Sequence, residues 1–224
     1  MFLKFPTYFC RLLMKEKIRN TATELFLNLG FKSVTMDDIA HEMGISKKTI
    51  YTHFNNKTAL VSEVTSSLFC VISEGIDLIC ATEKNPIEEL YEIKRFVMEH
   101  LKDEKSSPLY QLQKYYPKIY ANLKKKQFDV MQDCIVENLT RGVNSGMYRD
   151  NINVEFVARI YFIGVVGIKD NELFPTKMFP MYALMDQFLE YHLRGICTTK
   201  GLETLKQFIS LMETFKICPD VHIT

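Results

Sequence analysis

The chain has 224 residues, of which 28 are Lys or Arg and 27 are Asp or Glu, so its net charge is +1, and 47% of its residues are hydrophobic. This balance supports a full hydrophobic core and excludes a chain that is disordered throughout, because disordered chains combine low hydrophobicity with high net charge. Only nine Gly and seven Pro interrupt long segments with helical periodicity, so we expect an all-α protein.

The first 13 residues are apolar, but they are too few to span a bilayer and Arg11 interrupts them. Met14 begins a more ordinary helix start, so residues 1–13 are expected to be a non-native or frayed extension. The native start is then either Met1 or Met14. No stretch reaches the ~20 apolar residues that a membrane span requires, so a membrane partner is not expected.

The first expected helix runs from Lys15 to Gly30, where apolar residues recur on one helical face. Thr35 can cap a second helix at 35–43, and two aspartates follow in its first turn, where negative charge is favoured. Ser46 can cap a third helix at 47–53. A fourth helix is expected from about Thr58 through Leu78.

Prolines and asparagines mark the boundaries of the later helices. Asn85-Pro86 followed by two glutamates is a strong helix start, and Pro117 either breaks one helix or begins the next. No strand pair or internal repeat is evident. The expected later helices are 86–101, one from Pro108, a long one ending near Gly142, 153–169, 178–193 and 202–215.

The helices at 35–43 and 47–53 are joined through Gly44, with apolar residues at spacings typical of a helix-turn-helix. The stretch 44–57 contains three lysines and no acid. Residues 1–60 carry nine basic and five acidic side chains, so this part is +4 in a nearly neutral chain. Because the second helix of such a unit enters the major groove, cations suit it and acids would face phosphate. The pattern predicts a DNA-binding head, and the alternative is a solvated helical hairpin inside an α-bundle.

The segment from Ile18 to Val64 resembles the N-terminal domain of TetR-type (TetR/AcrR) transcriptional regulators, through "ATELFLNLGF", "TMDDIA", "MGIS" and "TIYTHFNNK" in this order. The resemblance implies a three-helix DNA-binding domain at 1–60 and a larger helical effector-binding and dimerisation domain at 61–224. It also implies a palindromic double-stranded operator. The residues expected to contact DNA are Thr35, Ser46, Lys47, Lys48, Thr49, Tyr51, Thr52, His53 and Lys57.

A protein that binds two-fold symmetric DNA needs a dimer interface, and two late helices carry apolar stripes that suit such an interface. The alternative is that these helices pair within one chain. The expected homodimer interface comprises Val157, Ile160, Tyr161, Gly164, Ile168, Met181, Leu184, Met185, Phe188 and His192.

The middle helices are rich in aromatic residues, which are more often core than pocket. The family resemblance nevertheless implies a cavity among them for a small, largely apolar effector. The expected lining is Phe96, Tyr110, Gln113, Tyr116, Met131 and Phe162.

Two other functions compete with a ligand-released repressor. An enzyme would need a recognisable nucleophile, metal or phosphate motif, and the sequence has none, so we expect neither catalysis nor a cofactor or metal. A helix-turn-helix protein without a small-molecule effector stays open. The six cysteines form no C-x-x-C pair, so we interpret them as reduced thiols of a cytoplasmic protein, with disulfides as the lesser alternative.

Overall fold

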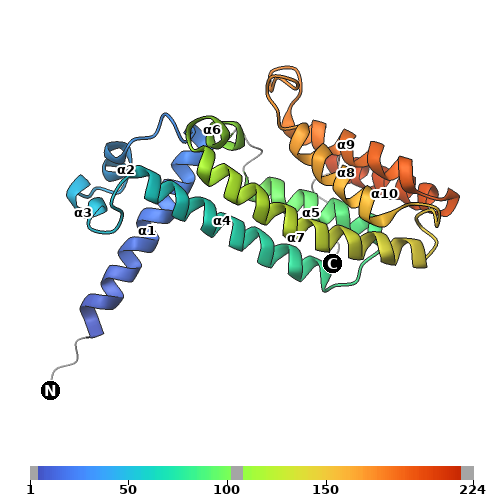
Figure 1. Cartoon of the computed structure of the whole chain (residues 1–224), viewed down its shortest axis with the longest axis horizontal. Coiled ribbons are helices and arrows are strands. Elements are labelled where there is room, and N and C mark those ends of the chain that lie inside the picture. Colours follow the sequence, from blue (N-terminus) through green and yellow to red (C-terminus); the bar gives the residue numbers. More distant parts are fainter. Residues whose placement is uncertain (1–4, 102–107, 218–224) are drawn as a thin grey trace. The chain divides into compact units, whose positions relative to one another are not determined.

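The computed structural model describes residues 5–101 and 108–217, which form helices and the turns between them (Figure 1). Within these ranges there is no strand, although Tyr148 and Cys197 form an isolated antiparallel β-bridge. The all-α prediction is confirmed. The helices are α1 (Phe5–Leu29), α2 (Met36–Glu42), α3 (Lys47–Tyr51), α4 (Lys57–Cys80), α5 (Pro86–His100), α6 (Pro108–Tyr115), α7 (Pro117–Asn144), α8 (Val154–Gly167), α9 (Met181–Ile196) and α10 (Thr199–Ile217).

The helices pack as two compact units. Unit 1 comprises the described parts of residues 1–74 and 98–127, and unit 2 comprises residues 75–97 and the described part of 128–224. Helices α4, α5 and α7 contribute residues to both units. The expected domain limits, 1–60 and 61–224, follow the sequence motif rather than this packing, and they stay a prediction.

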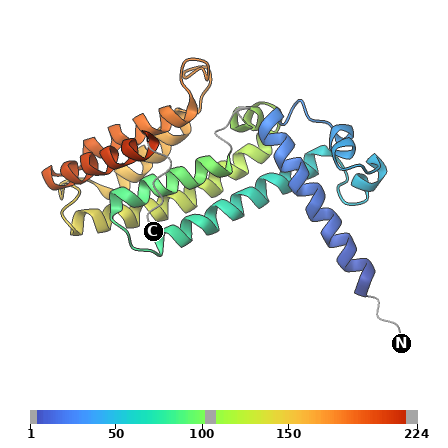
Figure 2. The same cartoon turned by 180° about the vertical axis from the view of Figure 1, so that it is seen from behind.

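The core of unit 1 forms where α1, α2, α3 and the first half of α4 meet, an arrangement visible from both sides (Figures 1 and 2). Helix α6 adds one buried side chain, and the start of α7 covers the core with half-buried ones. Burial of this many apolar side chains stabilises the unit, at about 25 cal/mol per Å² of area removed from water. The buried members are Ile18, Ala22, Phe26, Phe31, Val34, Met36, Ile39, Ala40, Ile50, Phe54, Leu60, Val61, Val64 and Leu112.

Helix α1 is longer than the sequence pattern predicted. It begins at Phe5 rather than near Lys15. Pro6 does not prevent this, because it is the second residue of the helix, where the missing N–H has no intrahelical partner to lose. At the other end Gly30 has a φ of 89°, the left-handed conformation expected of a residue that ends a helix.

By length and composition, α4 is apolar enough to cross a membrane. This corrects the expectation that no stretch of the sequence is long and apolar enough to do so. Its first half has a different explanation. Leu60, Val61 and Val64 are fully buried in the core of unit 1, and the Oδ1 of Asn56 accepts a hydrogen bond from the N–H of Ala59 at 2.8 Å. These residues make the first half of α4 part of the core of unit 1.

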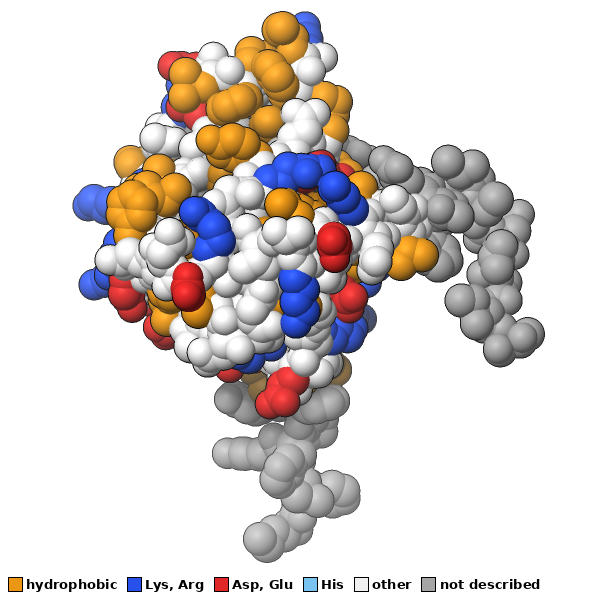
Figure 3. Space-filling model, turned by 90° about the vertical axis from the view of Figure 1, so that its right-hand side faces the viewer, with side chains coloured by type: hydrophobic (Ala, Val, Ile, Leu, Met, Phe, Trp, Pro, Cys, Tyr) orange, Lys and Arg blue, Asp and Glu red, His pale blue; other side chains and the backbone are white. Residues whose placement is uncertain are grey.

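Unit 2 is built from the early part of α5, most of α7, and α8, α9 and α10 around a second hydrophobic core. Helices α8 and α9 lie side by side in both views (Figures 1 and 2). The loop between them exposes apolar side chains. Figure 3 shows hydrophobic side chains gathered there at the top of the view, and Leu173 and Met178 are exposed in this loop.

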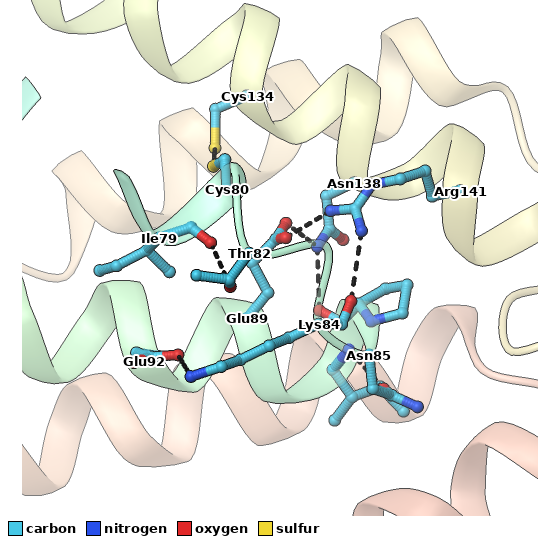
Figure 4. Close-up of polar contacts among 12 residues, drawn as sticks. Ile79, Cys80, Thr82, Lys84, Asn85, Glu89, Glu92, Cys134, Asn138 and Arg141 are labelled. Atoms are coloured by element: carbon cyan, nitrogen blue, oxygen red, sulfur yellow. Dashed lines mark hydrogen bonds and ion pairs between the residues drawn. The ribbon is translucent and has the colours of Figure 1, made fainter. Parts of the chain in front are cut away.

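A buried polar network links α5 to α7 in unit 2 (Figure 4). The side-chain amide of Asn138 donates to the Oε1 of Glu89 at 2.8 Å and to the carbonyl of Pro86 at 2.9 Å. The Tyr148 hydroxyl donates to the Asn138 Oδ1 at 3.2 Å, and Arg141 forms an ion pair with Glu89. Since Glu89 is fully buried, these donors are what make its charge tolerable there.

Candidate nucleic-acid interface

Helix α3 begins at a side-chain cap, as the sequence predicted. The Ser46 Oγ accepts a hydrogen bond from the N–H of Thr49 at 3.1 Å, and it lies 2.9 Å from the Thr49 hydroxyl. Both hydroxyls are therefore engaged with each other in the DNA-free protein. A contact from Ser46 or Thr49 to DNA would have to share or replace this pairing.

Gly44 makes the turn between α2 and α3. Its φ is 63°, a conformation that costs an L-residue with a Cβ roughly 1–2 kcal/mol. A Cβ placed on Gly44 would meet no atom within 4 Å, so backbone conformation rather than crowding calls for glycine. The N–H of Ile45 donates to the Ala40 carbonyl at 3.0 Å, which closes the turn.

The orientation of α3 is fixed by the side chains that it buries. Ile50 is fully buried and Phe54 nearly so, both in the core of unit 1. Tyr51 is 43% exposed, and Lys47 and Lys48 are exposed as well. The helix therefore turns one side inward and leaves its two lysines and a tyrosine at the surface, which is the phase that the sequence predicted.

Thr35 caps α2 through a reciprocal capping box. Its hydroxyl accepts from the N–H of Asp38 at 3.2 Å and donates to the Asp38 Oδ2 at 2.8 Å, while its own N–H donates to the same oxygen at 2.7 Å. These hydrogen bonds lower the pKa of the Asp38 carboxyl. The proposed second role of Thr35, contact with phosphate, would require its hydroxyl to change partner.

The two lysines of α3 differ in their surroundings. The Nζ of Lys47 lies 2.6 Å from the Oδ2 of Asp37, at the start of α2, and this hydrogen bond raises the pKa of Lys47. Lys48 has no hydrogen bond or ion pair from its ammonium to any residue that the structure describes. The sequence showed that the stretch 44–57 lacks acids, but it did not show that α2 brings one to Lys47.

The end of α3 gathers cations from α1 that the motif does not contain. Arg11 Nη2 donates to the Thr52 carbonyl at 3.4 Å, and the pKa of His53 is lowered by burial first and then by the charges of Arg11 and Lys15. The Thr52 hydroxyl is used locally, since it donates to the Thr49 carbonyl at 2.7 Å. Sequence reasoning missed Arg11 and Lys15, and a count of cations on α1 could have suggested them.

Lys57 is less available than the sequence suggested. Its Nζ donates to the carbonyl of Lys32 at 3.3 Å and lies 5.9 Å from the centre of the Phe26 ring. Burial lowers the pKa of Lys57, with the charge of Asp38 acting in the opposite direction. Contact between Lys57 and DNA stays a prediction.

The residues expected at the dimer seam lie on α8, α9 and the turn that follows α8, and most are buried within the chain itself. Gly164 permits a close approach, but to Phe188 of the same chain, because a Cβ at Gly164 would lie 2.3 Å from that ring. Ile160 is 45% exposed, while Val157 is half-buried. The buried members of the set are Tyr161, Ile168, Met181, Leu184, Met185 and His192.

Three of the expected effector-lining residues belong to unit 1. Gln113 is exposed, and the Tyr110 hydroxyl accepts a hydrogen bond from the ammonium of Lys114 at 3.3 Å. Tyr116 packs on the core of unit 1, with its ring centre 6.4 Å from that of Phe31. Burial raises the pKa of the Tyr116 hydroxyl.

The other three belong to unit 2, where each has a packing role. Phe96 fills the space over Gly75, since a Cβ there would lie 2.0 Å from its ring. Phe162 packs edge-on against Phe128 at 5.1 Å between ring centres, and Met131 packs against the second core. The effector assignment of all six residues stays a prediction.

Among the residues that the structure describes, no group of three or more His, Cys, Asp or Glu side chains is arranged to hold a metal ion.

Sequence comparisons agree with this geometry. The family model described as "Bacterial regulatory proteins, tetR family" matches residues 18–64. IcaR, the HTH-type negative transcriptional regulator of the biofilm operon icaADBC in Staphylococcus aureus (strain Newman), is 30% identical over 79 residues, which are 35% of this chain and 42% of IcaR. YerO, an uncharacterized HTH-type transcriptional regulator of Bacillus subtilis (strain 168), is 47% identical over 47 residues, 21% of this chain and 16% of YerO. The chain thus matches less than half of the length of these relatives.

Solved structures share the fold of most of the chain. A TetR-family transcriptional regulator from Agrobacterium tumefaciens superimposes with a TM-score of 0.68 at 19% identity, covering 84% of this chain and 100% of that one. SmeT, the repressor of the Stenotrophomonas maltophilia multidrug efflux pump SmeDEF, gives 0.63 at 16% identity, covering 83% and 91%. The family match at residues 18–64 contains the helix-turn-helix described above and the remainder has the fold of the solved regulators, so the segment 18–64 belongs to the tetR family of bacterial regulatory proteins.

Proposed function

We propose that this protein is a cytoplasmic transcription regulator, most simply a repressor, that binds double-stranded DNA through α3. The observation that carries the proposal is the division of α3 between Ile50, which is fully buried, and Lys48 and Tyr51, which are exposed beside each other. A helix anchored in this way can enter a major groove without exposing the core. IcaR is named as a negative transcriptional regulator, which supports repression.

The side chains of the proposed interface differ in the contacts that they can make with DNA. Lys48 is the cation best placed for a phosphate, because nothing in the described part of the chain neutralises it. Tyr51 offers a ring to a base edge or a thymine methyl and a hydroxyl to a phosphate. Arg11 extends the positive surface beside His53, whereas the ammonium of Lys15 is paired with the Glu63 carboxylate at 3.0 Å.

Selection of binding sites from randomised DNA, followed by titration of the selected fragment at several salt concentrations, tests this proposal. We expect Lys48→Ala to weaken binding about equally across sequences and to reduce the salt slope by about one unit. Lys125→Ala is the matched control, because Lys125 is an exposed lysine of α7 in the same unit. Equal salt slopes for both variants and the wild type would remove α3 from the interface.

We also propose that the protein acts as a homodimer on a two-fold symmetric operator. The exposed apolar face of α8 supports an intermolecular contact, with Phe156, Ile160 and Ile163 at 62%, 45% and 61% exposure. Helix α9 adds Tyr191, which is also exposed. Exposed apolar stripes of this kind usually mark interaction sites. Half-site centres are then expected about 34–36 Å apart, one turn of DNA.

Sedimentation at micromolar concentration tests the dimer. Ile163→Lys should shift the wild-type dimer toward monomer, because it places a charge in the proposed apolar contact. Leu78→Lys makes the same change at an exposed leucine of α4 and should leave the dimer intact. A wild-type protein that sediments as a monomer would refute the proposal.

We further propose that a small, largely apolar effector releases the protein from DNA. A structure of SmeT in complex with triclosan has this fold, with a TM-score of 0.63 at 14% identity over 84% of this chain, which supports an effector site in the helical body. A hundredfold loss of DNA affinity needs about 2.7 kcal/mol of coupling, and DNA must weaken effector binding by the same factor. A compound that stabilises the protein but binds equally well with and without DNA would favour the alternative, a regulator without an effector switch.

A further inference from the structure

Two cysteines that are distant in the sequence meet in unit 2. Cys80 is the last residue of α4 and Cys134 lies within α7, and their sulfur atoms are 3.4 Å apart. Figure 4 shows the two side chains pointing toward one another. Both are free thiols and both are half-buried. A disulfide has an S–S distance of about 2.05 Å, so the sulfurs need to approach by about 1.4 Å for the bond to form.

The end of α4 is held next to this pair by hydrogen bonds. The Thr82 hydroxyl donates to the Ile79 carbonyl at 2.6 Å, and the N–H of Glu83 donates to the Cys80 carbonyl at 3.1 Å. Glu83 has a φ of 48°, an unfavourable left-handed conformation for this residue. Arg141 Nη1 donates to the Lys84 carbonyl at 3.2 Å and so ties the following turn to α7. The turn that follows Cys80 is therefore bonded both to the end of α4 and to α7, the helix that carries Cys134.

We propose that Cys80 and Cys134 form a reversible disulfide when the protein meets a peroxide, and that the cross-link lowers the affinity of the protein for its operator. The second part rests on the proposed DNA-binding function. Intracellular disulfides outside hyperthermophiles are usually transient and catalytic or redox-sensing, so a facing pair of thiols in the proposed cytoplasmic regulator suits this role. Because α4 begins at Lys57 in unit 1 and ends at Cys80 in unit 2, it is the element whose end the cross-link would fix.

The chemistry needs one hydrogen peroxide for each disulfide. The Cys80 thiolate attacks one peroxide oxygen, so that an S–O bond forms, the O–O bond breaks, and the departing hydroxide takes up the proton released by Cys80 as water. The Cys134 sulfur then attacks the Cys80 sulfur. An S–S bond forms, the S–O bond breaks, and the second oxygen leaves as water with the Cys134 proton. Two thiols are oxidised and the peroxide is reduced to two waters.

The surroundings assign the order of attack and keep the resting form reduced. Burial raises the pKa of both thiols, and it raises that of Cys134 well above the ordinary range. Their hydrogen bond lowers the pKa of Cys80 and raises that of Cys134, which makes Cys80 the attacking group and Cys134 the resolving one. With both thiols largely protonated, oxidation is slow until peroxide accumulates.

The test begins with the reduced full-length protein under anaerobic conditions. After treatment with hydrogen peroxide and alkylation of the remaining thiols, peptide mass analysis should show the Cys80–Cys134 cross-link. Affinity for the selected DNA site should fall at least tenfold and return after dithiothreitol. Cys80→Ser and Cys134→Ser should each abolish both effects, with the alanine variants used if a serine variant fails to fold. Cys70→Ser, at an exposed cysteine of the same helix, should keep both.

Each outcome decides between the parts of the proposal. If peroxide oxidises Cys70 in the wild type while Cys80 and Cys134 stay unlinked, the disulfide site is refuted. If the cross-link forms but the DNA affinity is unchanged, the regulatory part is refuted. A protein that binds no DNA in either redox state would refute the proposed function instead, and mass analysis would still decide whether the disulfide forms.

Discussion

The ammonium of Lys47 and the carboxylate of Asp37 lie 2.6 Å apart, so α3 carries one of its two charges already paired with α2. Asp37→Asn should release Lys47 for a phosphate and remove a negative charge from the interface. We expect DNA affinity to rise about threefold to tenfold at 0.1 M salt, with a salt slope steeper by about one unit. Asp77→Asn, at an exposed aspartate of α4, makes the same charge change and should leave both values unchanged. Unchanged binding by Asp37→Asn would mean that Lys47 stays paired or lies outside the interface.

Adjacent positions of α3 should respond in opposite ways to substitution. Ile50 is fully buried, so Ile50→Asp places a charge in the core of unit 1 without a partner and should cost more than about 3 kcal/mol of stability. Tyr51→Ala should change stability by about 0.5 kcal/mol or less, because Tyr51 is exposed, and yet weaken DNA binding. Circular dichroism melting and DNA titration measure the two effects. A normal melting curve for Ile50→Asp would show that the buried side of α3 is assigned incorrectly.

The buried network of unit 2 predicts a stability effect at a position remote from DNA. Asn138→Ala would leave the Tyr148 hydroxyl without its acceptor and Glu89 without one of its donors. We expect a loss of about 2–4 kcal/mol, the range for unpaired buried polar groups with one charged member. Asn144→Ala, at the exposed end of the same helix, is the control, and denaturant unfolding is the measurement. A loss below about 1 kcal/mol would indicate that other donors compensate for Asn138.

His192 predicts a pH dependence of stability. Its Nε2 is buried without a hydrogen-bond partner in the described part of the chain, and burial lowers its pKa from 6.5 to about 4. Because the unfolded chain binds the proton first, stability present at pH 7 is lost as the pH falls from 6.5 toward 4, by up to about 3 kcal/mol.

The difference between the wild type and His192→Phe isolates this effect from the titration of carboxylates. The phenylalanine ring can occupy the same space beside Tyr161, whose ring centre is 4.8 Å from that of His192. The stability of His192→Phe relative to the wild type should rise as the pH falls from 7 to 4. A constant difference over this range would mean that His192 titrates normally in the folded protein.

The local signals of the chain were readable from the sequence alone. The caps of Thr35 and Ser46, the left-handed glycine at position 44, and the phase of α3 with Ile50 inward all agree with the structure. Each depends on residues a few positions apart, because capping, turn conformation and helical periodicity are set by the nearest neighbours in the chain.

The tertiary structure decided which distant groups meet. Asp37 reaches Lys47 across the turn, and Cys80 meets Cys134 across 54 positions, contacts that no local pattern encodes. The stripes of α8 and α9 illustrate the same limit. Periodicity showed that one side of each helix is apolar, but only packing revealed that Gly164 accommodates Phe188 of the same chain. An apolar stripe is stabilised equally well by packing against its own chain or against a second copy. Only the folded structure therefore shows which side of each helix stays exposed.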